Sequence, residues 1–365
     1  MGEPENKLAG GGDGGQHESA IVGCILGTAI GDSLGLPYEG VSAARAPRML
    51  GPPDRFRFLF GRGMVSDDTE HTCMVAQSLI ESGDDVAVFT KRFAWRLRFW
   101  FLLLPAGVGK ATAISCLKLW CGVPASRSGV FSAGNGPAMR SAIFAAAIKD
   151  KDSMLRFVSA SAKLTHVDPK AEYGALAVAL AARESATHPR VDASRWLADV
   201  ANCLGGEGTE LLGLLERAIA SVQQGESTRS FCSSLGLQRG VSGYVYHTVP
   251  ACIHAWLRNP TDLMGALKEV IECGGDADTT AAIVGGVVGA RVGRAGIPQD
   301  LCDSLAEWPR TIAWMERLGV CLSVAQSDAE TRVVPELNPL CVLARNVLFL
   351  LVVLFHGFRR LAPPY

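Results

Sequence analysis

Residues 272–292 read ECGGDADTTAAIVGGVVGARV, and the expected fold is organised around this stretch. A pair of glycines, which allow backbone angles that larger residues avoid, comes just before the acidic residues. Asp278 or Thr279 then stands where capping residues stand, ahead of a helix predicted over 281–292. The stretch therefore predicts a turn that leads into a buried helix.

Three glycines of this helix and its end, Gly285, Gly289 and Gly293, recur at intervals of four residues and so share one face. Such a smooth ridge permits close contact with another helix, which would hold the acidic turn against a partner segment. Apolar residues recur at helical spacing along the chain, and no segment shows the alternating pattern of a half-buried strand. We therefore expect an all-α fold.

A second acidic cluster lies far upstream. Residues 66–69, Ser-Asp-Asp-Thr, open another predicted helix over 71–80, much as Asp276 and Asp278 precede the first. Carboxylates and hydroxyls are the hard oxygen ligands that Mg²⁺ and Mn²⁺ prefer. If the two clusters met in space they could hold such ions. For either Asp pair alone, helix capping remains the alternative.

Five segments occur in an order that resembles the ADP-ribosylglycohydrolase family. They are residues 27–35 followed by Glu39, 66–69, 134–140, 164–166 and 274–279. The resemblance covers roughly residues 18–322. It implies a single compact orthogonal helical bundle as the catalytic domain, and hydrolysis of the glycosidic bond between ADP-ribose and an acceptor. The acceptor would be an ADP-ribosylated protein side chain, with arginine favoured, or a small molecule.

The resemblance also implies a ligand set for two Mg²⁺ or Mn²⁺ ions: Ser66, Asp67, Asp68, Asp276, Asp278 and Thr279. The ions would nearly cancel the negative charge of the four aspartates and Glu39, and would lower the pKa of a water molecule. Asp68, Asp278 and Glu39 are the expected catalytic residues, Glu39 acting as base towards water or as acid towards the leaving group. Asp32 is expected to be structural.

Residues expected to contact ADP-ribose follow from the same resemblance: Ser132, Gly134, Asn135, Gly136, His166 and Tyr244. A glycine-rich loop can bring backbone N–H groups close to a diphosphate. For His166 the alternative is a structural histidine, and for Arg140 either a structural salt bridge or a phosphate contact. For the segment that carries Tyr244, the alternative is core packing through Tyr246.

Two departures from the family pattern stand near the proposed ligands. Glu70 and His71 follow the first Asp pair and could alter metal preference, and Ala277 separates the second pair. Because no proposed ligand is lost, we expect an active enzyme. The alternatives are a non-catalytic ADP-ribose-binding relative and a hydrolase that cleaves the diphosphate and releases AMP.

The formal net charge of the chain is −1, which gives no overall basic field for nucleic acid. Its 11 cysteines show no Cys-x-x-Cys pair, and an odd number without a secretion signal favours reduced thiols in a cytoplasm. Residues 1–17 are Gly-rich and polar and are expected to be a disordered leader.

The last segment departs from the family body. A polar linker is expected over 323–338 and a hydrophobic helix and tail over 339–365, with the helix at 340–358. Its longest uninterrupted apolar run falls short of the ~20 residues that cross a bilayer, and a longer span would bury Arg345. The sequence leaves open a membrane-associated helix and a helix docked on the body or on another subunit. A helix over 93–104 could also suit a membrane surface, although a core helix with arginines at its edge is the expectation.

Overall fold

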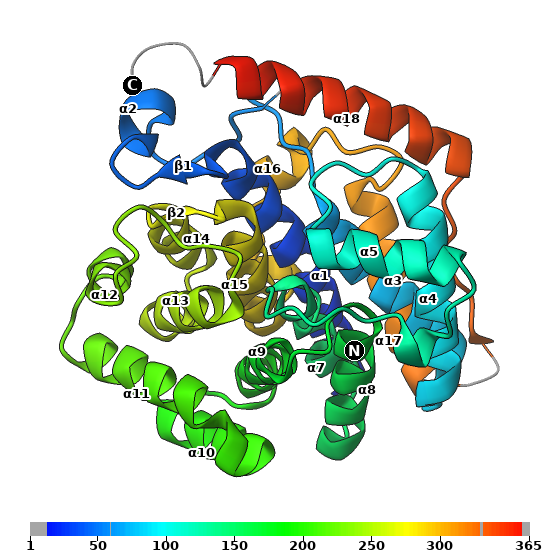
Figure 1. Ribbon diagram of the computed structural model, residues 1–365, viewed down its shortest axis with the longest axis horizontal. Coiled ribbons are helices and arrows are strands. Elements are labelled where there is room, and N and C mark those ends of the chain that lie inside the picture. Colours follow the sequence, from blue (N-terminus) through cyan, green and yellow to red (C-terminus); the bar gives the residue numbers. More distant parts are fainter. Residues whose placement is uncertain (1–12, 59, 329–330, 360–365) are drawn as a thin grey trace, which may run out of the picture.

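Two glycine-lined helices, α1 (Asp13–Gly35) and α15 (Ala277–Val292), pack antiparallel at the centre of the computed structural model (Figure 1). The structure describes residues 13–58, 60–328 and 331–359. A Cβ atom added to Gly27 would lie 2.1 Å from the carbonyl oxygen of Gly285, and one added to Gly23 would lie 2.3 Å from that of Gly289. The expected glycine ridge is therefore confirmed, and a matching ridge on α1 meets it.

This close contact continues to the ends of both helices, where it positions the site. A Cβ added to Gly35 would lie 2.2 Å from the carbonyl oxygen of Ala277. Beyond Gly35 the chain turns through a 3-10 helix, Leu36–Tyr38, into strand β1 (Val41–Ser42), which pairs antiparallel with β2 (Gly274–Gly275). The loop after α1 is thereby fixed beside the turn before α15.

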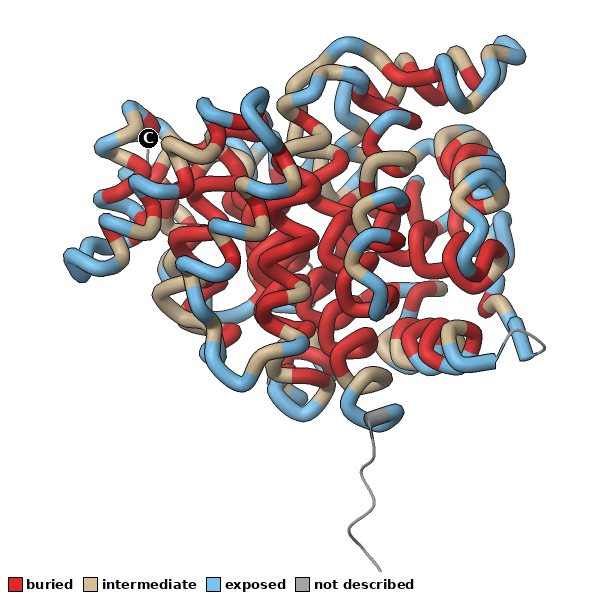
Figure 2. Tube along the Cα trace, turned by 90° about the horizontal axis from the view of Figure 1, so that it is seen from below, coloured by how far each residue is buried: buried red, intermediate tan, exposed pale blue. Residues whose placement is uncertain are grey.

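Helices surround this pair, and most share one large hydrophobic core with it, seen as the buried interior in Figure 2, while α12 and α18 bury apolar residues in two smaller clusters. The two-residue strands leave the architecture all-α, as expected. The surrounding helices are α2 (Ala46–Leu50), α3 (Asp67–Ser82), α4 (Val86–Leu102), α5 (Lys110–Trp120), α6 (Gly136–Met139), α7 (Ala142–Ala147), α8 (Lys151–Thr165), α9 (Pro169–Thr187), α10 (Ala193–Leu204), α11 (Thr209–Gln223), α12 (Thr228–Ser234), α13 (Val245–Arg258), α14 (Leu263–Ile271), α16 (Gln299–Ser304), α17 (Ile312–Ser327) and α18 (Pro339–Arg359).

Side-chain caps explain where many of these helices begin. Asp150 accepts a hydrogen bond from the backbone N–H of Ser153 at 2.7 Å and starts α8, while Asp168 accepts from that of Lys170 at 2.9 Å and starts α9. Ser66 takes the same position for α3, which begins at Asp67, ahead of the helix predicted over 71–80. Each cap satisfies backbone donors that have no partner inside the helix.

The structure corrects several expected boundaries. Helix α1 begins at Asp13, so residues 13–17 of the expected leader are helical; residues 1–12 lie outside the described residues. Helix α15 begins at Ala277, which makes Asp276 its N-cap in place of Asp278 or Thr279. Residues 323–327 of the expected linker belong to α17, because apolar residues of this helix continue to pack against the core up to Ala325.

Two apolar helices bear on the membrane question. Helix α4 buries one face, including Phe89, Phe93 and Trp100, which fits the expected core helix. The C-terminal helix α18 is present where it was expected, and the stretch Pro339–Phe358 is long and apolar enough to cross a membrane, with 28% of it buried. Residues Gly14–Tyr38 pass the same test of length and composition but are 94% buried, as a core helix is.

Candidate active site

The two acidic clusters meet at the adjoining starts of α3 and α15. Thr279 Oγ1 donates a hydrogen bond to Asp68 Oδ2 at 3.2 Å, and Ser66 Oγ donates to the same oxygen at 3.1 Å. Asp68 and Asp278 are buried, while Asp67 is half-buried. The helix starts that carry these side chains also favour negative charge.

Burying this many carboxylates close together lowers the stability of the folded protein. Burial first, and then the charge of neighbouring carboxylates, hold the pKa values of Asp67, Asp68 and Asp278 well above the usual aspartate range. Among the neighbouring charges, that of Glu39 raises the pKa of Asp278 the most, and it also raises the pKa of Asp67. The group therefore needs either protons or a cation.

The donor chemistry fits a cation. Asp68 Oδ1 and Asp278 Oδ1 are buried and have no hydrogen-bond partner. Buried polar atoms without partners are rare, and a hard divalent ion would satisfy carboxylate oxygens. Within the described ranges, no three His, Cys, Asp or Glu side chains already converge as a metal-binding group. The fit therefore rests on the unpartnered oxygens and not on a preformed cage.

Asp32 holds the backbone of residues 66–69 through hydrogen bonds, as expected for a structural residue. Its Oδ2 accepts hydrogen bonds from the backbone N–H groups of Ser66 at 2.8 Å and Thr69 at 3.2 Å, and from the Thr69 hydroxyl at 2.5 Å. Burial raises the pKa of Asp32 to about 7 against these hydrogen bonds, which lower it. Asp32 thus fixes the first turn of α3.

Asp276 connects the acidic cluster to the glycine-rich loop. Asn135 Nδ2 donates to Asp276 Oδ2 at 2.7 Å and to Thr248 Oγ1 at 3.0 Å, and the Asn135 backbone N–H donates to Gly243 O at 3.0 Å. The expected metal ligand and the expected sugar-binding loop are therefore adjacent. Thr248, which the sequence analysis did not single out, completes this contact. The sequence feature that could have indicated it is its position on α13, four residues after Tyr244.

His166 lies directly under the same loop. A Cβ added to Gly134 would lie 3.0 Å from His166 Nε2, and one added to Gly136 would lie 3.0 Å from His166 Cε1. A larger residue at either position would therefore be in tight contact with the ring. Burial, and then the charge of Arg140, lower the pKa of His166 to about 3, so the imidazole is neutral near neutral pH.

Arg140 holds the loop from the interior. It is completely buried and donates to Gly136 O at 3.0 Å, to Thr165 Oγ1 at 2.7 Å and to Ser161 O at 3.0 Å. These neutral partners give it a structural role. Because Thr165 Oγ1 accepts from Arg140, its own proton is available for His166 Nδ1 at 2.8 Å, which favours Nε2 as the protonated nitrogen facing the loop.

Tyr244 and Ser132 border the loop on its outer side. The backbone of Tyr244 bridges to Gly134, and its hydroxyl accepts a hydrogen bond from Lys170 Nζ at 3.0 Å. Ser132 is half-buried, with its hydroxyl 3.5 Å from a Cβ added to Gly134. Tyr246 is buried in the core, which was the alternative for this segment. Lys170 was missed because nothing in its local sequence distinguishes it from a surface lysine.

Glu39 occupies an exposed position beyond the end of α1. The next residue, Gly40, donates its backbone N–H to Gly275 O at 2.7 Å, which ties the Glu39 loop to the turn that precedes Asp276. Gly107 also borders the cluster, since a Cβ added there would lie 3.2 Å from Asp67 Oδ1. The rim of the site is thus built from loops on three separate parts of the chain.

Glu70 and His71 have partners outside the acidic cluster. Arg310 donates to Glu70 Oε1 at 2.7 Å and Trp100 donates to Glu70 Oε2. His71 Nδ1 lies 3.2 Å from the Arg140 guanidinium, and burial lowers its pKa well below the usual value. Glu70 also raises the pKa of Asp67 through its charge, and whether either residue alters metal preference stays a prediction.

Residues 14–331 match the family model described as ADP-ribosylglycohydrolase. An ADP-ribosyl-[dinitrogen reductase] glycohydrolase from Rhodospirillum rubrum is 27% identical over 296 residues, covering 79% of this chain and 90% of that protein. The ADP-ribosylhydrolase ARH3 of Homo sapiens is 28% identical over 341 residues, covering 79% and 90%. A solved structure titled ADP-ribosylglycohydrolase-related protein complex superimposes with a TM-score of 0.63 at 24% identity, over 86% of this chain and 99% of that one.

Proposed function

The chain belongs to the ADP-ribosylglycohydrolase family and is a glycohydrolase, and from this premise we propose that it is a metal-dependent enzyme that releases ADP-ribose from an acceptor. The acceptor is an ADP-ribosylated protein side chain, with arginine as the first candidate, or a small molecule. The observation that carries the proposal is the meeting of Asp68 with Thr279, beside two carboxylate oxygens that have no partner.

Asp67, Asp68, Asp276 and Asp278, with the hydroxyls of Ser66 and Thr279, are the donors that would hold two Mg²⁺ or Mn²⁺ ions. When bound, such ions would offset the carboxylate charge, orient the ribose hydroxyls and make a water molecule more acidic. Asp276 is held for this role by Asn135 at 2.7 Å.

The glycine-rich loop supports binding of the nucleotide part. Gly134 and Gly136 leave backbone atoms accessible above the His166 ring. A neutral His166 with a protonated Nε2 is a hydrogen-bond donor for a diphosphate or ribose oxygen. Ser132 and Tyr244 border the same loop, and a base or ribose can contact the Tyr244 ring or hydroxyl there.

Glu39 is the candidate for proton transfer. Its exposed loop faces the cluster closely enough to raise the pKa of Asp278. In hydrolysis at an anomeric carbon, a carboxylate can take a proton from the attacking water or give one to the leaving group as the transition state acquires oxocarbenium character. The geometry permits Glu39 either role.

The direct test is release of free ADP-ribose from an ADP-ribosylated arginine peptide in the presence of Mg²⁺ or Mn²⁺, followed by a panel of modified serine, metabolite and nucleic-acid acceptors. Release that requires the metal supports the proposal, and full activity after EDTA treatment would refute the metal-dependent scheme. Binding without release would indicate a non-catalytic relative. Release of AMP would indicate cleavage of the diphosphate instead.

All 11 cysteines of the chain are free thiols in the structure, which supports the proposed cytoplasmic location.

A further inference from the structure

Helix α18 packs on the body through the buried apolar side chains of Val342 and Phe349 and through three polar residues. Arg345 donates to Val65 O at 2.6 Å and to Glu307 Oε2 at 2.7 Å, and Asn346 Nδ2 donates to Leu103 O at 2.8 Å. Near the other end of the helix His356 Nε2 lies 3.1 Å from a backbone carbonyl oxygen and its ring lies against Phe58. The three polar side chains are buried. These contacts fix the rotation of α18 about its axis.

The outward side of α18 is apolar as a consequence. Six aliphatic and aromatic side chains there are between 48% and 75% exposed: Leu340, Leu348, Leu351, Leu354, Phe355 and Phe358. A surface helix in water normally has the opposite arrangement, with its apolar side on the core. Contiguous exposed apolar surface of this kind marks a site of association.

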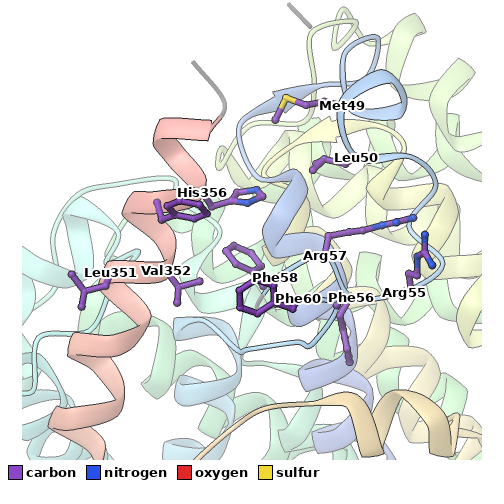
Figure 3. Close-up of a pocket in the computed structure, with 12 residues that line it drawn as sticks. Met49, Leu50, Arg55, Phe56, Arg57, Phe58, Phe60, Leu351, Val352 and His356 are labelled. Carbon is purple, nitrogen blue, oxygen red and sulfur yellow. The ribbon is translucent and has the colours of Figure 1, made fainter. Parts of the chain in front are cut away.

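Aromatic side chains from the body extend this surface at both ends of the helix. Phe60 is fully exposed, and with Phe56 and Phe355 it lines a cavity of about 590 Å³ between α18 and the loop after α2 (Figure 3). At the start of α18, Trp95 and Phe99 stack 5.8 Å apart and border a second cavity shared with α18. Tryptophan beside an aliphatic surface is typical of membrane interfaces.

The charge around this surface is positive. Residues 86–149, which include α4 and α5, contain no aspartate or glutamate, and neither do residues 337–365. Exposed Lys91 and Arg92 lie on α4, and Arg92 borders the cavity shared with α18. The nearby acidic residues are already paired: Glu81 with both Arg92 and Arg96, Glu336 with Arg96, and Asp54 with Arg57. A negatively charged partner surface would be complementary.

We propose that this face docks on an anionic lipid bilayer, with α18 lying in the plane of the interface. Crossing the bilayer would strip Arg345, Asn346 and His356 of their buried partners and place them in hydrocarbon, which is expensive. A symmetric dimer through this face would set the cationic surroundings of each copy against those of the other, since a two-fold interface is self-complementary. Of the two membrane arrangements, only the in-plane one keeps the polar contacts and buries the apolar side.

The proposal does not depend on the enzymatic activity. Because Arg345 contacts the residue before Ser66 and His356 contacts the loop before Glu39, docking would place the lipid surface near the segments that carry these two site residues.

The test is flotation of the full chain with vesicles of phosphatidylcholine alone or mixed with phosphatidylglycerol. We expect binding to the mixed vesicles that weakens in high salt, and roughly tenfold weaker binding after the double change Leu351→Gln and Phe355→Gln. The matched control changes the half-buried Leu212 and Ile219 of α11 to glutamine, at the opposite corner of Figure 1 from α18, and should bind as the original chain does.

Circular dichroism and thermal unfolding establish that each variant is folded before the comparison. Equal flotation of the Leu351/Phe355 variant and the original chain would overturn the proposal, as would absence of binding to anionic vesicles. A dimer in light scattering that the same double change dissociates, without vesicle binding, would assign the face to a second copy and also overturn it.

Discussion

The hydroxyl of Thr279 donates to a carboxylate oxygen of Asp68 at 3.2 Å, across 211 positions of sequence. The contact joins the first turn of α15 to the first turn of α3. It brings together the two acidic clusters, residues 66–69 and 276–279. Asp68 Oδ1 and Asp278 Oδ1 are left without hydrogen-bond partners. These buried carboxylates therefore lower the stability of the fold, and the function proposed above accounts for their presence.

Asp68→Asn should abolish ADP-ribose release while increasing the stability of the metal-free protein by about 1 kcal/mol, because the amide removes one of several buried like charges. In the original chain, Mn²⁺ at about a hundred times its Kd should add about 3 kcal/mol of stability, and this gain should disappear in the variant. Thermal unfolding with and without Mn²⁺ measures both effects. The exposed Asp84→Asn serves as control, and an unchanged Mn²⁺ response in Asp68→Asn would contradict the ligand assignment.

Glu39→Gln should separate chemistry from metal binding. Proton transfer by a positioned carboxylate contributes on the order of 10²–10⁴ in rate, and turnover should fall by that amount. The stabilisation by Mn²⁺ should remain, because Glu39 is not among the proposed ligands. Turnover and Mn²⁺-dependent unfolding are measured on the same preparation. Loss of both together would move Glu39 into the ligand set.

Part of this site could be predicted from local pattern, while the proposed ligand set and the ADP-ribose contacts came from the family resemblance. Ser66 and the glycines of α15 have roles set by capping and by close backbone approach, which a few adjacent residues specify. The direction of Glu70 could not be predicted in this way, because its partners Trp100 and Arg310 lie 30 and 240 positions away. The orientation of α18 was equally hidden, since its apolar composition says nothing of which side is buried until the partners of Arg345 are known.

Gly27→Ala should be strongly destabilising. The added Cβ would lie 2.1 Å from the carbonyl oxygen of Gly285, so α1 and α15 would have to separate, at a cost of about 3 kcal/mol or more. Gly213→Ala on α11 is the matched control, since its Cβ meets nothing within 4 Å and should add about 0.5–1 kcal/mol of stability. Urea unfolding of both variants gives the comparison, and equal stability of the two would show that the helices are not in close contact.

Arg345→Met should cost about 3–5 kcal/mol, because it leaves Glu307 buried without its cationic partner. The double variant Arg345→Met with Glu307→Gln should recover part of that loss, since the uncompensated charge is gone. A double-mutant cycle by urea unfolding isolates the coupling between the two side chains. Additive losses would mean that Arg345 acts through its bond to Val65 O instead.

His254 should make the fold sensitive to acid. It is buried between Thr228 and Ser221, and burial lowers its pKa to about 4, whereas the unfolded chain has the ordinary value of about 6.5. Between these values the unfolded state binds the extra proton, so stability is complete above about pH 6.5 and falls as the pH drops towards 4. The full difference corresponds to about 3 kcal/mol.

His254→Gln keeps a donor and an acceptor but does not titrate, so it should be less stable at neutral pH and should lose less stability than the original chain on acidification. Urea unfolding between about pH 7 and about pH 4 measures both slopes. Parallel slopes would mean that His254 does not carry this part of the pH dependence.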